Sequence, residues 1–382
     1  MIYLDNAATG GQKPDQVITA VTSALHTCAN PGRSGHKLSL SCATLVHTCR
    51  QAIHEFFKGY GYDRVIFTKN CTEALNIALL GVLRKGDHVV TTCMEHNSVL
   101  RPLAFLQKQG VIDYDVCPLE EDGNISANDI AALVRKNTRM VTVTTASNVT
   151  GATPSIREIR AALPPNVLLL CDGAQGCGHL DVDMRGMGID FLAVAGHKGM
   201  MGIQGSGALL FSDRVNPAPL LFGGTGSISV SLEMPDFYPD GLEAGTISYP
   251  AVLSLLEGVR YLTAHKRRIY TRLGLLTKRL WSGLKDIPAY QIYSKPNPCG
   301  IVSFAHQDLS SEQLAAILSN EYDIAVRGGL HCAPLMHEAL GSLDGGLVRV
   351  SLSHFNNDSE IDELLNALRE IAKRDFNAYM GM

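Results

Sequence analysis

The chain alternates between short apolar runs and amphipathic segments, and this alternation limits the folds that are open to it. Segments with helical periodicity separate several of the apolar runs, at 72–84, 98–108, 127–135 and 156–163. The runs themselves have the length and β-branched content of buried strands and lie at 64–68, 87–92, 112–117, 140–145, 167–171, 191–194 and 208–211. Strands that alternate with helices are typical of a mainly parallel sheet covered on both faces, so we predict an α/β fold.

Beyond about residue 250 the pattern changes and predicts a second, smaller unit. A long helix is expected over 250–284, followed by a helix at 311–320, a strand at 347–352 and a final helix at 359–374. This mixture is typical of an α+β domain. We therefore predict a large domain at residues 15–255 and a small domain formed by residues 1–14 and 256–382.

Charge and hydropathy exclude two broad classes of function. The 382 residues are 46% hydrophobic and 18% charged, which is an ordinary globular composition. The formal net charge of -4 argues against nucleic-acid binding, which usually needs a basic surface. No apolar run approaches the roughly 20 residues that cross a bilayer, and the start of the chain has no signal-peptide pattern. We expect a cytoplasmic protein with neither a nucleic-acid nor a membrane partner.

The ten cysteines are scattered, and no two of them have the C-x-x-C spacing of a zinc site or a redox pair. We therefore predict no metal site, and we expect most of these cysteines to be small, buried hydrophobic side chains. Cys332 is the exception, because it lies between a Gly-Gly and an Ala-Pro in the segment 327–334. A thiol in such a segment indicates a nucleophile.

Two polar residues at the ends of apolar runs point to a particular chemistry. Asp172 closes the run 167–171, and Lys198 follows the run 191–194. Pyridoxal phosphate needs an amine that attaches it and a carboxylate that pairs with its ring nitrogen. Lys198 and Asp172 are the predicted pair, while a surface lysine and a helix-capping aspartate are the plain structural alternatives.

Nine short motifs then occur in a characteristic order along the chain. They lie at 6–9, 72–74, 95–96, 147–151, 172–175, 196–198, 243–246, 327–333 and 349–351. In this order they resemble the class V aminotransferase family and, within it, the cysteine desulfurases and selenocysteine lyases of the group II kind. The resemblance covers nearly the whole chain. It implies the fold type I of pyridoxal-phosphate-dependent transferases, with a mainly parallel seven-stranded sheet in the large domain.

The resemblance also implies which residues hold pyridoxal 5′-phosphate. Lys198 would attach the cofactor and move the Cα proton, Asp172 would pair with the ring nitrogen, and His96 would stack on the ring. The remaining cofactor contacts that it implies are Asn148, Gln175, Cys71, Thr72, His197 and, across a homodimer with shared active sites, Thr246. Many relatives have serine at the position of Ala195, so one hydroxyl for the phosphate is expected to be missing or to come from a neighbouring residue.

The substrate contacts implied by the resemblance come from both ends of the chain. Arg349 would bind the α-carboxylate of an amino acid, because a guanidinium matches a carboxylate in geometry and charge. Arg327 would support the thiolate of Cys332 or the active-site loop, and an ion pair that only holds the loop is the structural alternative. Arg33 and His36 are pocket candidates, and Asn148 would face the substrate as well as the cofactor.

The activity that the resemblance implies is that of a cysteine desulfurase. Such an enzyme converts L-cysteine into L-alanine and leaves a persulfide, here on Cys332, for transfer to an acceptor protein or thiol. Selenocysteine lyase shares the whole set of residues, and an epimerase or aminotransferase of the same class would need no cysteine. A catalytically silent scaffold on the same fold is the non-enzymatic alternative.

Overall fold

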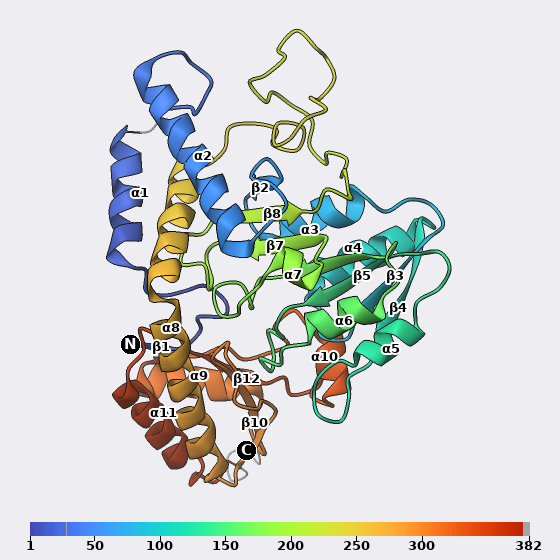
Figure 1. Cartoon of the computed structure of the whole chain (residues 1–382). Coiled ribbons are helices and arrows are strands. Elements are labelled where there is room, and N and C mark those ends of the chain that lie inside the picture. The colour runs from blue at the N-terminus through green and yellow to red at the C-terminus, as the bar shows by residue number, and fades with distance from the viewer. Residues whose placement is uncertain (28, 377–382) are drawn as a thin grey trace.

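The computed structural model describes residues 1–27 and 29–376, and its centre is a seven-stranded sheet in the order β2-β8-β7-β6-β5-β3-β4 (Figure 1). Its strands are β2 (Val65–Thr68), β3 (Asp87–Thr92), β4 (Ile112–Cys117), β5 (Thr138–Thr144), β6 (Leu168–Asp172), β7 (Phe191–Ala195) and β8 (Gly207–Phe211). Strand β8 runs antiparallel to both of its neighbours, and every other adjacent pair is parallel. The predicted mainly parallel sheet is confirmed.

Alternate residues of the central strands enter different cores, which shows that the sheet is covered on both faces. In β6, Leu168 and Leu170 belong to one core, whereas Leu169 and Cys171 belong to the other. The covering helices include α1 (Asp15–Thr27), α2 (Lys37–Phe57), α3 (Cys71–Leu80), α4 (Asn97–Lys108), α5 (Ala127–Ala132), α6 (Ile156–Ala162) and α7 (Met184–Met187). Since successive side chains of a strand point to opposite faces, a strand buried on both faces is a continuous apolar run, as the sequence shows.

Helix α3 ends earlier than the sequence predicts. The predicted helix reaches residue 84, but α3 stops at Leu80 and the chain turns at Gly81. Val82 and Leu83 are nevertheless buried. Because these two residues are apolar, the sequence pattern continues past the residue at which the helix ends.

A second region follows the sheet, and helix α8 (Tyr249–Lys285) leads into it (Figure 1). Three antiparallel strands, in the order β12-β10-β9, form its sheet, and β1 pairs with β11 beside it. The bounds are β1 (Ile2–Tyr3), β9 (Tyr290–Ile292), β10 (Ile301–His306), α9 (Ser311–Tyr322), β11 (Ile324–Ala325), α10 (Pro334–Ala339), β12 (Val348–Ser351) and α11 (Asp358–Ile371). Because α8 continues through residue 255, the division into 15–255 and 1–14 plus 256–382 stays a prediction.

The prediction that most cysteines are buried is confirmed. Cys332 is exposed, and the other described cysteines are buried and unpaired. Cys28 lies outside the described residues. Across residues 1–27 and 29–376, no helix combines the length and the apolar character needed to cross a bilayer.

Candidate active site

A small cavity lies at the carboxyl ends of the parallel strands, where loops from several strands meet. In open α/β sheets this edge is where ligands bind. Eight of the nine residues predicted to hold the cofactor line the cavity, namely Cys71, Thr72, His96, Asn148, Asp172, Gln175, His197 and Lys198. Polar side chains that the sequence places after separate strands are therefore brought to one place by the fold.

Asp172 forms one polar wall of the cavity and is only 3% exposed. Its Oδ1 accepts a hydrogen bond from the backbone N–H of Ala174 at 2.8 Å and another from the thiol of Cys71 at 3.4 Å. Burial raises the pKa of Cys71 well above its usual range, so this thiol stays protonated and acts as the donor. Both bonds go to Oδ1, so neither uses Oδ2, which is the carboxylate oxygen left for a ring N–H.

Lys198 lies three residues beyond the end of β7 and lines the same cavity. Burial lowers the pKa of its amine, and the negative charge of Asp172 opposes that shift. A lowered pKa increases the neutral, nucleophilic fraction of an amine, which is the form that condenses with a carbonyl group. The amine, the free carboxylate oxygen and the cavity therefore fit pyridoxal phosphate.

The N-terminus of helix α3 provides a site for an anion beside this pair. Asn70 caps the helix by accepting a hydrogen bond from the N–H of Glu73 at 2.9 Å. The N–H groups of Cys71 and Thr72 in the first turn have no partner within the helix. Such N–H groups, together with the helix dipole, favour a bound phosphate.

Ser98 is a residue of this site that the sequence reasoning missed. It lines the cavity, and its hydroxyl lies 2.8 Å from that of Thr72 and 2.9 Å from Nδ1 of His96. Ala195 also lines the cavity, at the position where a serine was expected. Ser98 therefore offers a nearby hydroxyl, and its place at the start of helix α4, two residues after His96, is the signal that could have found it.

His96 is held as the cap of helix α4. Its Nδ1 accepts a hydrogen bond from the N–H of Ser98 at 3.0 Å, so the neutral ring carries its hydrogen on Nε2. Burial lowers the pKa of His96, which favours this neutral form. A neutral, fixed imidazole is suited to stacking on a ring and to passing a proton through Nε2.

The N-terminal segment packs against two residues that line the cavity. Gln175 donates from Nε2 to the carbonyl of Ala7 at 3.0 Å, and Nδ1 of His197 lies 3.1 Å from the hydroxyl of Thr9. Burial lowers the pKa of His197 to about 4, so its ring is neutral at physiological pH. These contacts explain why the motif at 6–9 accompanies the motifs at 172–175 and 196–198.

Glu95, next to His96, is completely buried. Its Oε1 accepts hydrogen bonds from the hydroxyl of Thr92 at 2.7 Å and from the N–H of Thr144 at 2.8 Å. Its Oε2 has no partner among the described residues. Burial, with a further contribution from the charge of Asp172, raises the pKa of Glu95 from 4.5 to about 8.

We expect Glu95→Gln to make the stability of the protein less dependent on pH. Folded Glu95 keeps its proton up to about pH 8, whereas the unfolded chain releases it near 4.5. The folded state therefore binds more protons in this window, and stability falls as the pH rises through it. The fall is at most about 1.4 kcal/mol per pH unit for one group. Glutamine does not titrate, so the fall should disappear.

Urea unfolding of the cofactor-free protein between pH 5 and 8 measures this effect. Glu121→Gln is the matched control, because Glu121 is exposed and its replacement removes the same charge from the surface. If both variants follow the pH dependence of the parent chain, Glu95 is not the titrating group.

The segment that carries Cys332 is held in an unusual backbone conformation. His331 and Cys332 have φ angles of 52° and 59°, in the left-handed region that L residues rarely adopt. Each such residue costs about 1–3 kcal/mol. Nδ2 of Asn148 donates to the carbonyl of His331 at 2.7 Å, and the N–H of Asn97 donates to that of Cys332 at 2.7 Å. These two bonds hold the segment against the cavity.

Two arginines contact this segment or its anchor: Arg327 lies beside the thiol, and Arg349 bonds to Asn148. Nη2 of Arg327 is 4.0 Å from Sγ of Cys332. Arg349 is 1% exposed, pairs with Asp5 at 2.8 Å and donates to the carbonyl of Asn148 at 3.0 Å. Its Nε is buried and has no partner among the described residues. A buried guanidinium with an unused donor is suited to a carboxylate.

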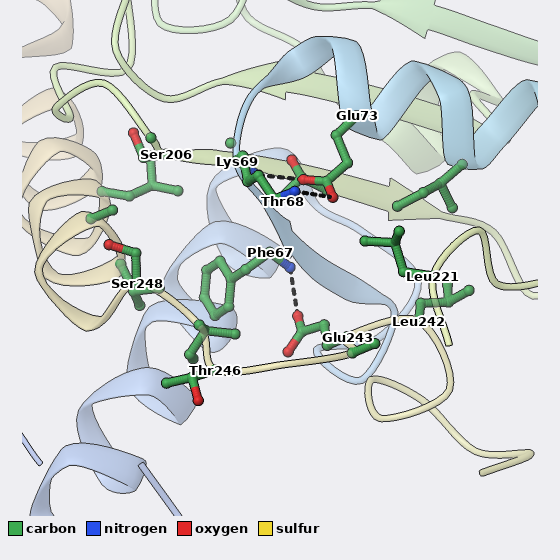
Figure 2. Close-up of a pocket in the computed structure, with 18 residues that line it drawn as sticks. Phe67, Thr68, Lys69, Glu73, Ser206, Leu221, Leu242, Glu243, Thr246 and Ser248 are labelled. Atoms are coloured by element: carbon green, nitrogen blue, oxygen red, sulfur yellow. Dashed lines mark hydrogen bonds and ion pairs between the residues drawn. The ribbon is translucent and has the colours of Figure 1, made fainter. Parts of the chain in front are cut away.

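Thr246 and Arg33 lie outside the cavity that contains Lys198. They line a neighbouring pocket, and Thr246 also lines a second one, shown in Figure 2, in which Glu243 accepts a hydrogen bond from the N–H of Phe67 at 2.6 Å. His36 is exposed and caps helix α2. Within one chain these three residues are not part of the site, and their predicted roles stay predictions.

Comparison with known proteins agrees with this architecture. The family model described as aminotransferase class-V matches residues 2–364. A protein of Methanothermobacter thermautotrophicus named "Probable cysteine desulfurase" is 35% identical, over 97% of this chain and 94% of its own length. One of the same name from Pyrococcus abyssi is 32% identical, over 98% and 94%. The chain therefore belongs to the class V aminotransferase family.

A solved structure shows the same fold in a related protein. The apo structure of a cysteine desulfurase from Thermococcus onnurineus is similar with a TM-score of 0.88 and 30% identity. The similarity covers 97% of this chain and 94% of that one. The predicted fold class, type I of the pyridoxal-phosphate-dependent transferases, is confirmed.

Proposed function

We propose that this protein is a pyridoxal-phosphate-dependent cysteine desulfurase that converts L-cysteine into L-alanine and a persulfide on Cys332. One observation carries the proposal. An exposed thiol sits on a segment that Asn148 ties to the cavity lined by Lys198 and Asp172. The relatives named cysteine desulfurase support the same activity.

Each residue of the site has its own proposed role in the reaction. When bound, pyridoxal phosphate supplies an electron sink that makes the Cα proton of an amino acid acidic. Lys198 takes that proton on its amine and later returns it, and the carboxylate of Asp172 would hold the ring N–H. Arg349 binds the α-carboxylate. Asn148, Gln175, His96, His197, Cys71 and Thr72 would complete the cofactor pocket.

Cys332 removes the sulfur. Its thiolate attacks the sulfur of the substrate, an S–S bond forms, and the C–S bond breaks with its electron pair left on the substrate carbon. Protonation of that carbon gives alanine, and the persulfide passes its outer sulfur to an acceptor protein or thiol. The guanidinium of Arg327 lies 4.0 Å from Sγ, so it contacts the sulfur that reacts.

Selenocysteine lyase is the second candidate, because it would use the same residues. The exposed Cys332 favours desulfurase over an epimerase or aminotransferase, since neither of those needs a thiol at this position. A silent scaffold is disfavoured by the placement of Lys198 and Asp172 in one cavity. The proposed location is the cytoplasm, in keeping with the unpaired state of the described cysteines.

The test uses purified protein with added pyridoxal phosphate, L-cysteine and a reductant. We expect a visible absorption band from the bound cofactor and equal amounts of alanine and sulfide. A band with no alanine would leave the cofactor proposal standing and reject cysteine as the substrate.

We further propose that the active protein is a homodimer with shared active sites. The segment between β8 and α8 projects from the body of the chain (Figure 1) and exposes a series of large apolar side chains. These are Leu221, Phe222, Ile228, Val230, Leu232 and Phe237. Exposed apolar clusters are typical of protein interfaces. In such a dimer Thr246, which lies outside its own cavity, would reach the phosphate of the partner's cofactor, and Arg33 and His36 would approach the shared pocket.

Thr246→Val is expected to weaken cofactor binding without changing the oligomer. Loss of one hydrogen bond to a charged phosphate corresponds to an affinity loss of about tenfold to a hundredfold. Equilibrium titration with pyridoxal phosphate measures the loss. Light scattering should give twice the 41.2 kDa of one chain for both proteins. A monomeric parent chain with full activity would contradict the shared-site proposal.

A further inference from the structure

Behind the Cys332 segment, two buried histidines form a continuous hydrogen-bonded chain. His331 is 2% exposed and His337 is 0% exposed. Nδ1 of His331 lies 3.4 Å from Nε2 of His337, and Nδ1 of His337 lies 2.9 Å from the hydroxyl of Ser342. At the other end, Nε2 of His331 lies 3.3 Å from the carbonyl oxygen of Arg327.

The carbonyl of Arg327 determines which atom donates in each of these hydrogen bonds. A carbonyl oxygen can only accept, so Nε2 of His331 carries the hydrogen and its Nδ1 accepts. His337 must then donate from Nε2 to His331, and its Nδ1 accepts from Ser342. Three hydrogen bonds thus run in one direction from Ser342 to the backbone of Arg327. Burial lowers the pKa of both histidines, which is consistent with two neutral rings.

This row of hydrogen bonds ends at Arg327, whose backbone and side chain both lie close to Cys332. The carbonyl of Arg327 also accepts from the N–H of Arg349 at 2.8 Å, and the side chain of Arg327 lies 4.0 Å from Sγ of Cys332. His331 immediately precedes Cys332, and both have left-handed backbones. A side chain that anchors His331 therefore also restricts the position of the thiol.

We propose that His337 is a positioning residue for Cys332, because its ring clamps the ring of His331 and so holds the strained segment that presents the thiol beside Arg327. The proposal rests on the proposed role of Cys332 as the nucleophile. Among the described residues, no hydrogen bond joins the ring of His337 to a cavity residue or to the thiol. Its effect passes through His331 and the backbone of the segment.

The test compares three variants. His337→Phe keeps a planar ring but removes both hydrogen bonds, whereas His337→Gln keeps a donor for His331. His306→Phe is the control for loss of a buried histidine in the same region. His306 is 8% exposed, and among the described residues its ring bonds only to the N–H of Asp308, two residues away. Hydrogen exchange of the cofactor-free protein, followed in peptides that cover 327–337, measures how firmly the backbone of this segment is held.

In His337→Phe we expect exchange in this segment to become about tenfold faster or more, with little change in the other two variants. In the loaded enzyme, kcat for alanine formation from L-cysteine should fall about tenfold to a hundredfold in His337→Phe, while KM stays within about twofold. His337→Gln should recover most of kcat.

Unchanged exchange in His337→Phe would overturn the proposal, and so would equal losses in His337→Phe and His306→Phe. Failure of the proposed function has a different signature. If Cys332→Ala retained desulfurase activity, the nucleophile assignment would fail, while the exchange experiment would still report whether His337 holds the segment.

Discussion

Replacing Cys332 with alanine is expected to abolish alanine formation from L-cysteine while leaving the cofactor in place. The thiol is the group proposed to accept the sulfur, so its loss should lower kcat/KM by about a thousandfold or more. Cys332 is exposed and lies outside the residues that line the cavity, so the visible absorption band should not change. Alanine assays and absorption spectra of the two proteins measure both effects.

The same variant separates sulfur from selenium chemistry. Selenium is the better leaving group and can depart without a protein thiol, so activity on selenocysteine should remain within about tenfold of the parent value. Cys42→Ala is the matched control, because Cys42 is buried within helix α2. If Cys332→Ala kept more than a tenth of its activity on cysteine, the persulfide mechanism would be rejected.

Lys198→Ala is expected to remove covalent attachment of pyridoxal phosphate together with nearly all catalysis. The amine is proposed both to attach the cofactor and to transfer the Cα proton. Loss of the proton transfer alone corresponds to about a hundredfold to ten-thousandfold in rate. Borohydride reduction should fix the cofactor to Lys198 of the parent chain and not to the variant, as mass spectrometry of the two proteins would measure. Small added amines should restore part of the lost rate in the variant.

Lys13 offers the control for this experiment. Its amine donates to the carbonyl of His197 at 3.0 Å, and burial lowers its pKa to about 8. It is therefore a second lysine close to the site whose neutral fraction is larger than that of an ordinary lysine. We expect Lys13→Ala to retain the borohydride label on Lys198, and a label that moved to Lys13 or vanished in this variant would contradict the assignment of Lys198.

Much of the cofactor cavity could be predicted because its residues follow strands. Asp172 ends β6, and Lys198 follows β7. The carboxyl ends of parallel strands share one edge of a sheet, so polar residues at those ends meet. Ser98 was not predicted, because its role depends on how the start of helix α4 packs beside Thr72. No local pattern encodes that contact.

The surroundings of Arg349 also depend on contacts that the sequence does not predict. The sequence places an arginine inside an apolar strand and so indicates an anionic partner. It does not say that Asp5, 344 residues away, takes one donor, or that Nε remains without a partner among the described residues. Such pairings follow from the parallel ladder between β1 and β11 and from the bridge between Asp5 and Ser351.

The sequence by itself determined the layered α/β fold, the strand-end pair of Lys198 and Asp172, and the exceptional cysteine. Each of these depends on local periodicity or on a short motif, and both are visible along the chain. Only the tertiary structure decided that Asn148, 183 residues from His331, holds the Cys332 segment, and that Glu95 is buried beneath the site. Those features arise where distant segments exclude water from one another, so they exist only after folding.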